Sequence, residues 1–273
     1  MKRFAAAGAA VLTASVAARA QRDGSPGALH FRLEKVELEV NGLHEAHDGL
    51  TLVQLSDIHV GPRTPDRRIL AAIDAVNAIR PDLVILTGDY VTRKGDPLER
   101  VPELFSRLQV PAIATLGNHD HWVDAFTLRR GLEGINIPVL RNEHTVVQVR
   151  GAPLGVVGID DGVTGRADPI RALKGSATLH SRIVLAHAPP TVDTLPPGEN
   201  LVVFSGHTHG GQFYFGGVTD EVFRRAGQPY VRGLYRKGGN QLYVNRGLGF
   251  GTGGTLPRVN SDPEVTLVTL RRG

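Results

Sequence analysis

The chain has 273 residues, of which 41% are hydrophobic and 21% are charged, and its formal net charge is +4. This length suits one large domain or two small ones, and the composition excludes a disordered or fibrous chain. The weak charge, without a basic block that has aromatic residues between its members, argues against a nucleic-acid-binding surface, and the lack of cysteine excludes disulfides and thiolate metal ligands.

Residues 1–20 are typical of an export signal. A basic start precedes an Ala-rich apolar run over residues 4–18, and Ala18-Arg19-Ala20 offers small residues at the positions that a signal peptidase reads. The run is short for a transmembrane span. We therefore expect an exported protein, in the periplasm or at the outer face of the cytoplasmic membrane, with residues 1–20 as signal peptide or, alternatively, as membrane anchor. Residues 21–29 are interpreted as a linker and residues 30–273 as one domain.

The domain opens with a stretch in which apolar and charged residues alternate, from His30 to Val40. Alternation with a period of two predicts a half-exposed β-strand. The phase of the alternation slips near Lys35, which predicts either a bulge in this strand or a turn between two shorter strands.

Strands and helices then alternate along the chain. The segment from Thr64 to Ile79 begins with an N-cap residue followed by a proline and an acid, continues with apolar residues at helical spacing, and is ended by Pro81. Apolar strands are expected at residues 50–55, 83–86 and 110–116, with a shorter helix at 98–108. This order predicts parallel βαβ units.

The second half of the chain is richer in strands. Short apolar strands are expected at residues 154–159, 182–186, 201–204, 241–244 and 265–270, and the stretch 216–239 is interpreted as a loop. No sequence repeat or domain boundary is visible, so a layered α/β sandwich is the simplest architecture.

Five of the expected strands end in residues that bind metals well. These residues are Asp57 and His59, Asp89, Asn118 and His119, His187, and His207 with His209. Ligands of open α/β sheets gather just past the carboxyl ends of the strands. We therefore expect these side chains to converge on one pocket if the strands share a sheet edge.

The residue types suit two divalent metal ions. Asp57 and His59 stand two positions apart, so both side chains can face the same side of a strand end. A carboxylate such as that of Asp89 can bridge two ions about 3.5–4 Å apart, the separation found in two-metal hydrolytic sites. The amide oxygen of Asn118 and several imidazoles complete a ligand set that favours Mn, Fe, Zn or Ni over Mg or Ca.

Each of these residues alone has an ordinary structural explanation. A single histidine at a strand end is more often hydrogen-bonded than metal-bound, and an Asp or Asn is a common turn or cap residue. The joint, ordered pattern is what indicates a metal site. A His-X-His pair also occurs in metallo-β-lactamase-like hydrolases, but Gly210 and Gly211 stand where their Asp-His is expected.

The sequences of five of these segments resemble the five motifs of the calcineurin-like metallophosphoesterases, in the order found in that family. The segments are Asp57-Ile58-His59, Gly88-Asp89, Gly117-Asn118-His119-Asp120, Ala186-His187 and Gly206-His207-Thr208-His209. The longer stretches 54–59, 206–212 and 245–249 are similar to a bacterial exported or membrane-bound subgroup, which includes YkuE- and YaeI-like phosphodiesterases and a UDP-2,3-diacylglucosamine hydrolase. The resemblance implies a four-layer α/β/β/α sandwich.

The resemblance also implies a role for each site residue. One metal ion would be bound by Asp57, His59 and His209, and the other by Asn118, His187 and His207, with Asp89 bridging the two. His119 would not bind metal; with Asn118 it would contact the substrate phosphate, and it would protonate the leaving oxygen as general acid. The ions implied are divalent, with Mn expected and Fe or Zn as alternatives.

These roles imply a phosphoesterase that hydrolyses phosphodiester or pyrophosphate bonds with a hydroxide activated by two metal ions. A lipid-linked substrate such as UDP-2,3-diacylglucosamine is implied by the subgroup, and with it peripheral or anchored membrane association. The alternatives are a phosphomonoesterase or nucleotide phosphatase of the same fold, and a non-catalytic protein that binds metal or phosphate.

Several residues near the motifs have two interpretations. Arg246 is expected either to contact the substrate phosphate or to have a structural role, and Asp120 either to orient His119 or to cap the next helix. His121 and Trp122 either shape the site or, more simply, fill space beside it. The remaining histidines are expected at the surface, at positions 30, 44, 47, 144 and 180.

Overall fold

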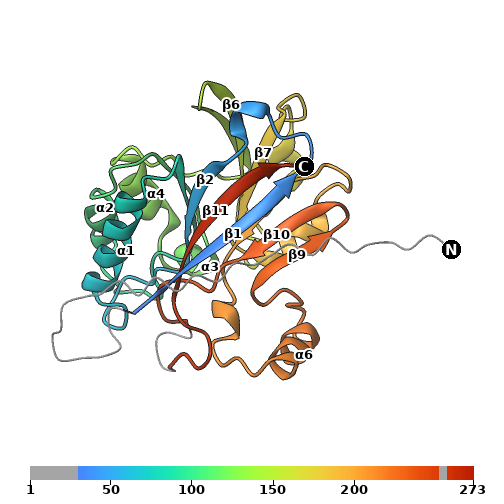
Figure 1. Cartoon of the computed structure of the whole chain (residues 1–273). Coiled ribbons are helices and arrows are strands. Elements are labelled where there is room, and N and C mark those ends of the chain that lie inside the picture. The colour runs from blue at the N-terminus through green and yellow to red at the C-terminus, as the bar shows by residue number, and fades with distance from the viewer. Residues whose placement is uncertain (1–29, 252–256) are drawn as a thin grey trace.

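The computed structural model describes residues 30–251 and 257–273 (Figure 1). The signal peptide and the linker expected within residues 1–29 lie outside the described residues. The strands are β1 (Arg32–Val40), β2 (Leu50–Leu55), β3 (Leu83–Thr87), β4 (Ala112–Thr115), β5 (Glu143–Val149), β6 (Ala152–Ile159), β7 (Ser181–Ala186), β8 (Val202–Ser205), β9 (Gly233–Lys237), β10 (Asn240–Val244) and β11 (Glu264–Arg272). The helices are α1 (Asp66–Ile79), α2 (Arg100–Phe105), α3 (Asn118–Val123), α4 (Ala125–Glu133), α5 (Pro169–Leu173) and α6 (Gly217–Arg225), with short 3₁₀ turns η1 (Glu45–His47), η2 (Pro189–Thr194) and η3 (His209–Gly211).

Within the described residues, the strands form two sheets. The first has five strands in the order β1-β11-β2-β3-β4, and the second has six in the order β5-β6-β7-β8-β10-β9. Strands β2, β3 and β4 pair in parallel, as do β6, β7, β8 and β10. The predicted parallel pairing is thus confirmed. It places the carboxyl ends of β2, β3 and β4 together at one edge of the first sheet, and those of β7 and β8 together at one edge of the second.

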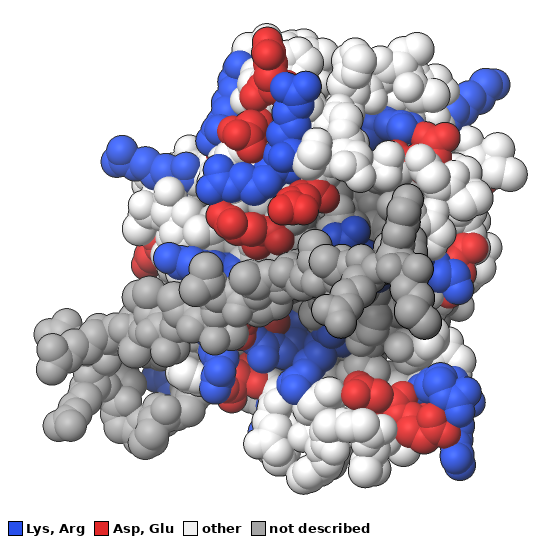
Figure 2. Space-filling view, turned by 45° about the vertical axis from the view of Figure 1, so that its right-hand side comes forward, with Lys and Arg blue, Asp and Glu red and all other residues white. Residues whose placement is uncertain are grey.

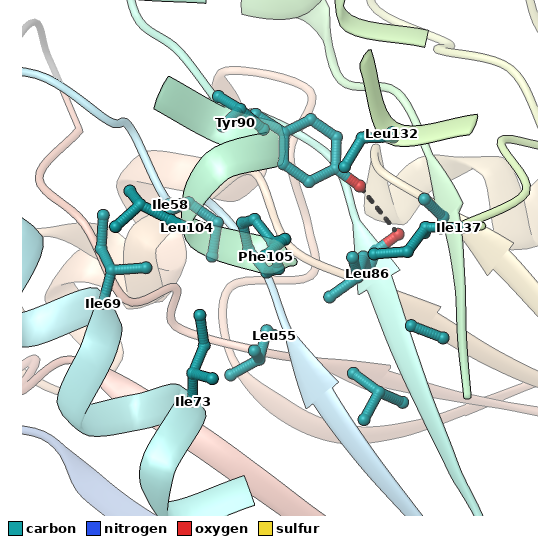
Figure 3. Packing of buried hydrophobic residues seen from close by; sticks show 14 of the residues in the cluster. Leu55, Ile58, Ile69, Ile73, Leu86, Tyr90, Leu104, Phe105, Leu132 and Ile137 are labelled. Carbon is teal, nitrogen blue, oxygen red and sulfur yellow. Dashed lines mark hydrogen bonds between the residues drawn. The ribbon is translucent and has the colours of Figure 1, made fainter. Parts of the chain in front are cut away.

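Buried apolar clusters join the two sheets and the helices into four layers. Helices α1, α2 and α4 cover the outer face of the first sheet, where Ile73 and Phe105 lie in one cluster with Leu55 and Leu86 of the strands (Figure 3). Side chains of both sheets fill the space between them, among them Leu52, Ile85, Leu154, Ile183 and Phe204. A thinner layer of α5 and η2 covers the outer face of the second sheet. The expected α/β/β/α order is therefore the order observed.

The prediction of a bulge or turn near Lys35 was wrong. Strand β1 is continuous and pairs in parallel with β11 in one unbroken register. The apolar phase changes because the strand buries opposite faces along its length. Leu33 packs against the helix-side cluster, whereas Val36 and Leu38 lie in the cluster between the sheets.

Helix α1 begins slightly later than predicted. Its N-cap is Pro65 rather than Thr64, and the buried Thr64 hydroxyl makes no hydrogen bond. The predicted end of the helix is confirmed, because Arg80 adopts a left-handed conformation with φ 53° directly before Pro81.

The stretch 216–239, predicted as a loop, contains helix α6 and strand β9. Strand β9 is an edge strand that pairs with β10 alone within the described sheets, and α6 lies at the lower edge of the molecule, away from both sheets (Figure 1). Phe215, Val218 and Val222 are 60%, 70% and 59% exposed, so the helix turns apolar side chains to the solvent. Val218 and Val222 stand four positions apart, so helical spacing was present in the sequence, but the helix is short and lies in a stretch rich in glycine and charged residues, and the prediction missed it.

The surface of the domain mixes both signs of charge. Figure 2 shows Lys and Arg side chains in small groups, several of them beside Asp or Glu, on the face in view. In the described part of the chain, no helix is both long enough and apolar enough to cross a membrane.

His47, expected at the surface, is fully buried, and this prediction was wrong. Its ring nitrogens lie 2.7 Å from Ser181 Oγ and 3.1 Å from the Val149 carbonyl oxygen. Burial lowers the pKa of His47. The ring joins η1 to strands of the second sheet, a long-range contact that local sequence does not reveal.

We predict that Phe105→Ala lowers the free energy of unfolding by about 3–5 kcal/mol, because removal of this buried ring leaves a cavity beside Tyr90. Urea unfolding of the metal-free protein, followed by circular dichroism, measures the change. Phe126→Ala is the matched control, since that ring is 69% exposed, and its effect should stay within about 0.5 kcal/mol. Equal losses in both variants would contradict the core position of Phe105.

Candidate metal centre

Two groups of potential metal ligands lie at the carboxyl ends of the strands. The first cluster is Asp57 and His59, after β2, with His209 of η3; the second cluster is Asp89, after β3, His187, after β7, and His207, after β8. Within each cluster the ligand atoms lie within 4.8 Å of one another. The strand ends belong to both sheets, so the side chains converge where two sheet edges adjoin. The expected convergence is therefore reached without the single shared edge on which the prediction was conditional.

Asp89 stands between the two clusters. Its Oδ2 lies 3.1 Å from His187 Nε2 in its own cluster and 3.9 Å from His59 Nε2 in the other. In the first cluster, His209 Nε2 lies 3.1 Å from His59 Nε2 and 3.3 Å from Asp57 Oδ1. A carboxylate in this position can serve cations in both clusters.

The loops that carry the potential metal ligands turn sharply where the strands end. Most of the cluster residues have positive φ, namely Asp57 (50°), His59 (51°), Asp89 (57°), His207 (73°) and His209 (51°). The left-handed region costs a non-glycine residue about 1–2 kcal/mol. Backbone hydrogen bonds hold two of these loops together: Asp57 N–H donates to the Gly88 carbonyl at 2.9 Å, and His59 N–H to that of Asp89 at 3.0 Å. Such strain is typical of functional sites.

Two glycines allow the backbone to pack directly against the carboxylates of the clusters. A Cβ on Gly117 would lie 2.2 Å from Asp89 Oδ1, and a Cβ on Gly206 would lie 2.1 Å from Asp57 Oδ2. No side chain fits at these distances, so each glycine is required by the carboxylate that lies against it.

Hydrogen bonds orient the imidazoles. His187 Nδ1–H donates to the Thr87 carbonyl at 2.7 Å, and His59 Nδ1 lies 2.9 Å from Thr92 Oγ1. Each bond fixes the ring and leaves Nε2 directed at the clusters, as metal-binding histidines require.

One buried oxygen of the site, Asn118 Oδ1, has no hydrogen-bond partner. An unsatisfied buried acceptor costs about 1–3 kcal/mol, and a cation at the second cluster would satisfy it. His187 Nε2 faces the Asp89 carboxylate at 3.1 Å in the same cluster. Both observations fit the metal that the donor set suggests.

Burial controls the charge states of the first cluster. Burial raises the pKa of Asp57, lowers that of His59 to about 4, and lowers that of His209, to which the nearby Arg258 also contributes. The two imidazoles are therefore neutral near pH 7, and neutral imidazole is the form that binds a metal.

The second cluster contains a charged pair. Burial works to raise the pKa of Asp89, but His187 and His59 hold it well below its usual range. Burial lowers the pKa of His187, yet Asp89 raises it well above the usual range. A cation between these groups would take the place of the imidazolium proton beside the carboxylate.

His119 lies at the rim of the centre and belongs to neither cluster. Its backbone N–H donates to Asp89 Oδ1 at 2.9 Å, and its Nδ1–H donates to the Thr92 carbonyl at 2.6 Å. The ring packs edge-on against His59 and Trp122, with centroids 5.2 and 4.8 Å away. Trp122, which is 55% exposed, lies directly beside this ring.

Asp120 caps the helix, one of its two predicted roles. Its carboxylate accepts the N–H groups of Asp89, Tyr90 and Gly117, each at 2.8 Å. Burial, together with Asp89, raises its pKa to about 8. The carboxylate thereby ties the start of α3 to the loop that carries Asp89.

Arg246 does not reach the two clusters. Its guanidinium pairs with Glu264, at 2.5 Å, and with Glu34. These ion pairs favour the structural role that was weighed for this residue, and the predicted substrate contact has no support in the geometry.

Sequence reasoning missed two residues near the site. Arg258 donates to the Arg246 and Gly249 carbonyls, at 2.7 and 3.0 Å, and lies 3.0 Å from His209 Nδ1; no local pattern indicated it. Asp161 is buried with Oδ1 unbonded, and its charge acts on His187. It follows the end of β6, so the strand-end signal that identified the other residues applied to it as well.

A family model and several curated relatives match this chain. The model described as calcineurin-like phosphoesterase matches residues 50–211, which include all the cluster residues, Asn118 and His119. The metallophosphoesterase YkuE of Bacillus subtilis (strain 168) is 30% identical over 235 residues, 82% of this chain and 80% of that protein. The UDP-2,3-diacylglucosamine pyrophosphatase LpxG of Chlamydia trachomatis serovar D is 27% identical over 276 residues, 81% and 83% of the two chains. The phosphodiesterase YaeI of Escherichia coli (strain K12) is 30% identical over 227 residues, 79% and 80%.

We predict that Thr92→Val weakens metal binding at the first cluster about 10–100-fold, because His59 loses the hydroxyl that orients its ring. Calorimetric titration of metal-stripped protein with Mn²⁺ measures the affinity. Thr194→Val is the matched control, since it makes the same substitution at a hydroxyl that bonds a backbone carbonyl in η2 and no histidine. Equal Mn²⁺ affinity in the wild type and Thr92→Val would rule out this orienting role.

Proposed function

The chain belongs to the calcineurin-like phosphoesterase family, and we propose that it hydrolyses phosphodiester or pyrophosphate bonds with two bound metal ions. The observation that carries this proposal is the pair of clusters that meet at Asp89, with the buried Asn118 Oδ1 left without a hydrogen-bond partner. Membership of the family makes the protein a hydrolase of phosphoric esters; the metal count, the substrate and the roles of the residues are the proposal.

Each cluster would hold one divalent ion. The first would be bound by Asp57, His59 and His209, and the second by Asn118, His187 and His207, with Asp89 between them. Bound ions of this kind lower the pKa of water and stabilise the charge that develops on a phosphoryl group. The mixed nitrogen and oxygen donors suit Mn²⁺, with Fe and Zn as the other candidates.

His119 would supply the leaving oxygen with a proton. Its position supports this role, because Nδ1–H is held by the Thr92 carbonyl and Nε2 stays available at the rim of the centre. The backbone bond from His119 to Asp89 keeps the ring beside the second cluster. A positioned general acid contributes about 10²–10⁴-fold to a rate.

The substrate we favour is lipid-linked, such as UDP-2,3-diacylglucosamine. Support comes from the relative named for that substrate and from the exposed apolar side chains of Phe215, Val218 and Val222 on and before α6. Helix α6 follows the loop that carries His209, so an amphiphilic substrate at the metal centre and a lipid surface at α6 are compatible.

The central test is hydrolysis of bis(p-nitrophenyl) phosphate by metal-stripped protein with added Mn, Fe, Zn or Mg. We expect metal-restored turnover, a fall of about 10²–10⁴-fold in kcat for His119→Ala with metal content unchanged, and loss of both turnover and bound metal for Asp89→Asn. His180→Ala, at an exposed histidine outside the motifs, is the control and should match the wild type.

Two results would contradict this function. Bound metal without turnover on diesters, monoesters or lipid-linked pyrophosphates would favour a protein that only binds metal or phosphate. Much faster hydrolysis of p-nitrophenyl phosphate than of the diester would point to a phosphomonoesterase.

We also propose that the protein is exported and acts at a membrane surface. Support comes from the signal-like residues 1–20 and from the apolar side chains of α6. On expression of the full chain in a Gram-negative host, we expect the protein in the periplasmic and membrane fractions, and Val218→Glu with Val222→Glu should shift it from membrane to soluble periplasm.

Val146→Glu is the matched control for the membrane test, since Val146 is 44% exposed on β5 and should not change the distribution. Deletion of residues 1–20 should leave the protein in the cytoplasm. Full-length protein found in the cytoplasm would contradict export, and an unchanged membrane fraction in the α6 variant would contradict contact between α6 and lipid.

A further inference from the structure

A hollow of about 690 Å³ lies beside the metal centre, between the loops that follow β2 and β3. The charged residues of its lining are Asp66, Arg93, Lys94, Asp96 and Arg100. A smaller pocket continues it inward to His59, with Arg63, Thr92 and Phe250 in its wall. Gly61, Pro62, Arg93 and Asp96 line both, so the hollow opens onto a metal-ligand residue of the first cluster.

The acidic residues of the hollow are already engaged. Asp66 pairs with Arg100 at 2.7 Å. Asp96 accepts the backbone N–H groups of Thr92 and Arg93, at 2.8 and 3.0 Å, and its side chain is only 5% exposed. The charge of Asp66 is thus paired with Arg100, and that of Asp96 reaches one cation of the hollow, Arg93, at 4.0 Å.

The remaining charges are positive. Arg63 and Lys94 form no ion pair within the described part of the chain and are exposed. Arg93 is 68% exposed, and its one close carboxylate, that of Asp96, lies 4.0 Å away. Three cationic side chains thus stand at and inside the mouth of the centre with no strong partner of their own.

The cations are positioned with respect to the reaction centre. Arg93 directly follows Thr92, whose hydroxyl bonds His59 and whose carbonyl bonds His119. The Asp96 carboxylate fixes this loop through its N–H groups. The short loop that orients the predicted ligand His59 and the predicted general acid His119 therefore also fixes the backbone position of Arg93.

We propose that Arg63, Arg93 and Lys94 form a subsite for the second phosphoryl group of a diphosphate substrate. This inference rests on the function proposed above and narrows it to pyrophosphate bonds. A phosphodiester carries one negative charge, whereas a diphosphate diester carries two, one on each phosphoryl group, and the second phosphoryl group needs cationic partners of its own. Guanidinium groups match phosphate oxygens in charge and in bidentate geometry.

The test compares UDP with UMP, which differ by one phosphoryl group, as ligands of the full chain loaded with Mn²⁺. Isothermal titration calorimetry gives both affinities and needs no turnover, so failure of the subsite and failure of the hydrolytic function remain distinguishable. We expect the wild type to favour UDP over UMP at least about 10-fold, and the Arg63→Ala, Arg93→Ala double variant to lose that preference.

The readout is the ratio of the two affinities, because general damage to the metal centre lowers both together. Arg107→Ala, which removes an exposed arginine beyond the end of α2, should keep the wild-type ratio, and Arg93→Lys should keep part of the preference. A wild type that does not distinguish UDP from UMP, or a double variant that still favours UDP about 10-fold, would overturn the proposal. Loss of binding to anionic lipid vesicles in the double variant, with an unchanged ratio, would instead assign these cations to a membrane surface.

Discussion

Asp89 occupies the junction of the two sheets, with Oδ1 accepting the His119 N–H group at 2.9 Å and Oδ2 lying 3.1 Å from His187 Nε2. The carboxylate is in place because Asp120 binds the backbone on either side of it and because Gly117 has no Cβ to displace it. It therefore connects three elements: the loop after β3, the start of α3 and the end of β7. Both clusters and the rim histidine depend on this single position.

Such a centre is unfavourable by itself. Several of its residues have left-handed backbones, each at a cost of about 1–2 kcal/mol, and carboxylates and imidazoles lie buried beside one another with acceptors unsatisfied. Burial of the apolar clusters on both faces of the first sheet stabilises the fold and offsets the free-energy cost of this strain. A bound cation would offset part of the remaining cost, since anything that binds only the folded state stabilises it.

The surface on one side of the metal centre is cationic, and the surface on the other side is apolar. The loops after β2 and β3 present the cations of Arg63, Arg93 and Lys94, whereas the chain after β8 leads into α6, with the apolar side chains of Phe215, Val218 and Val222. All of these groups are on loops or on a peripheral helix, while the ligands are anchored at the ends of buried strands. Loops can change with little effect on the core, so recognition of the substrate is physically separable from the metal site.

Local pattern was enough to locate the main strands, helix α1 and the cluster residues, because apolar periodicity and polar strand ends are properties of neighbouring residues. It did not reveal α6, a short helix whose apolar residues Val218 and Val222 face the solvent. It also did not reveal the reason for the phase change in β1, which is that different layers bury opposite faces of the strand. Only the tertiary structure decided that two sheets meet at the site, that Asp120 caps α3 instead of orienting His119, that Glu34 and Glu264 occupy Arg246, and that Arg258 contacts His209. Apart from the cap of α3, these contacts join residues that are distant in the chain, as His187 and Thr87 are. Periodicity and motifs in the sequence identify the polar side chains at the end of each strand. The packing of the two sheets decides which of these side chains, distant in the sequence, come into contact.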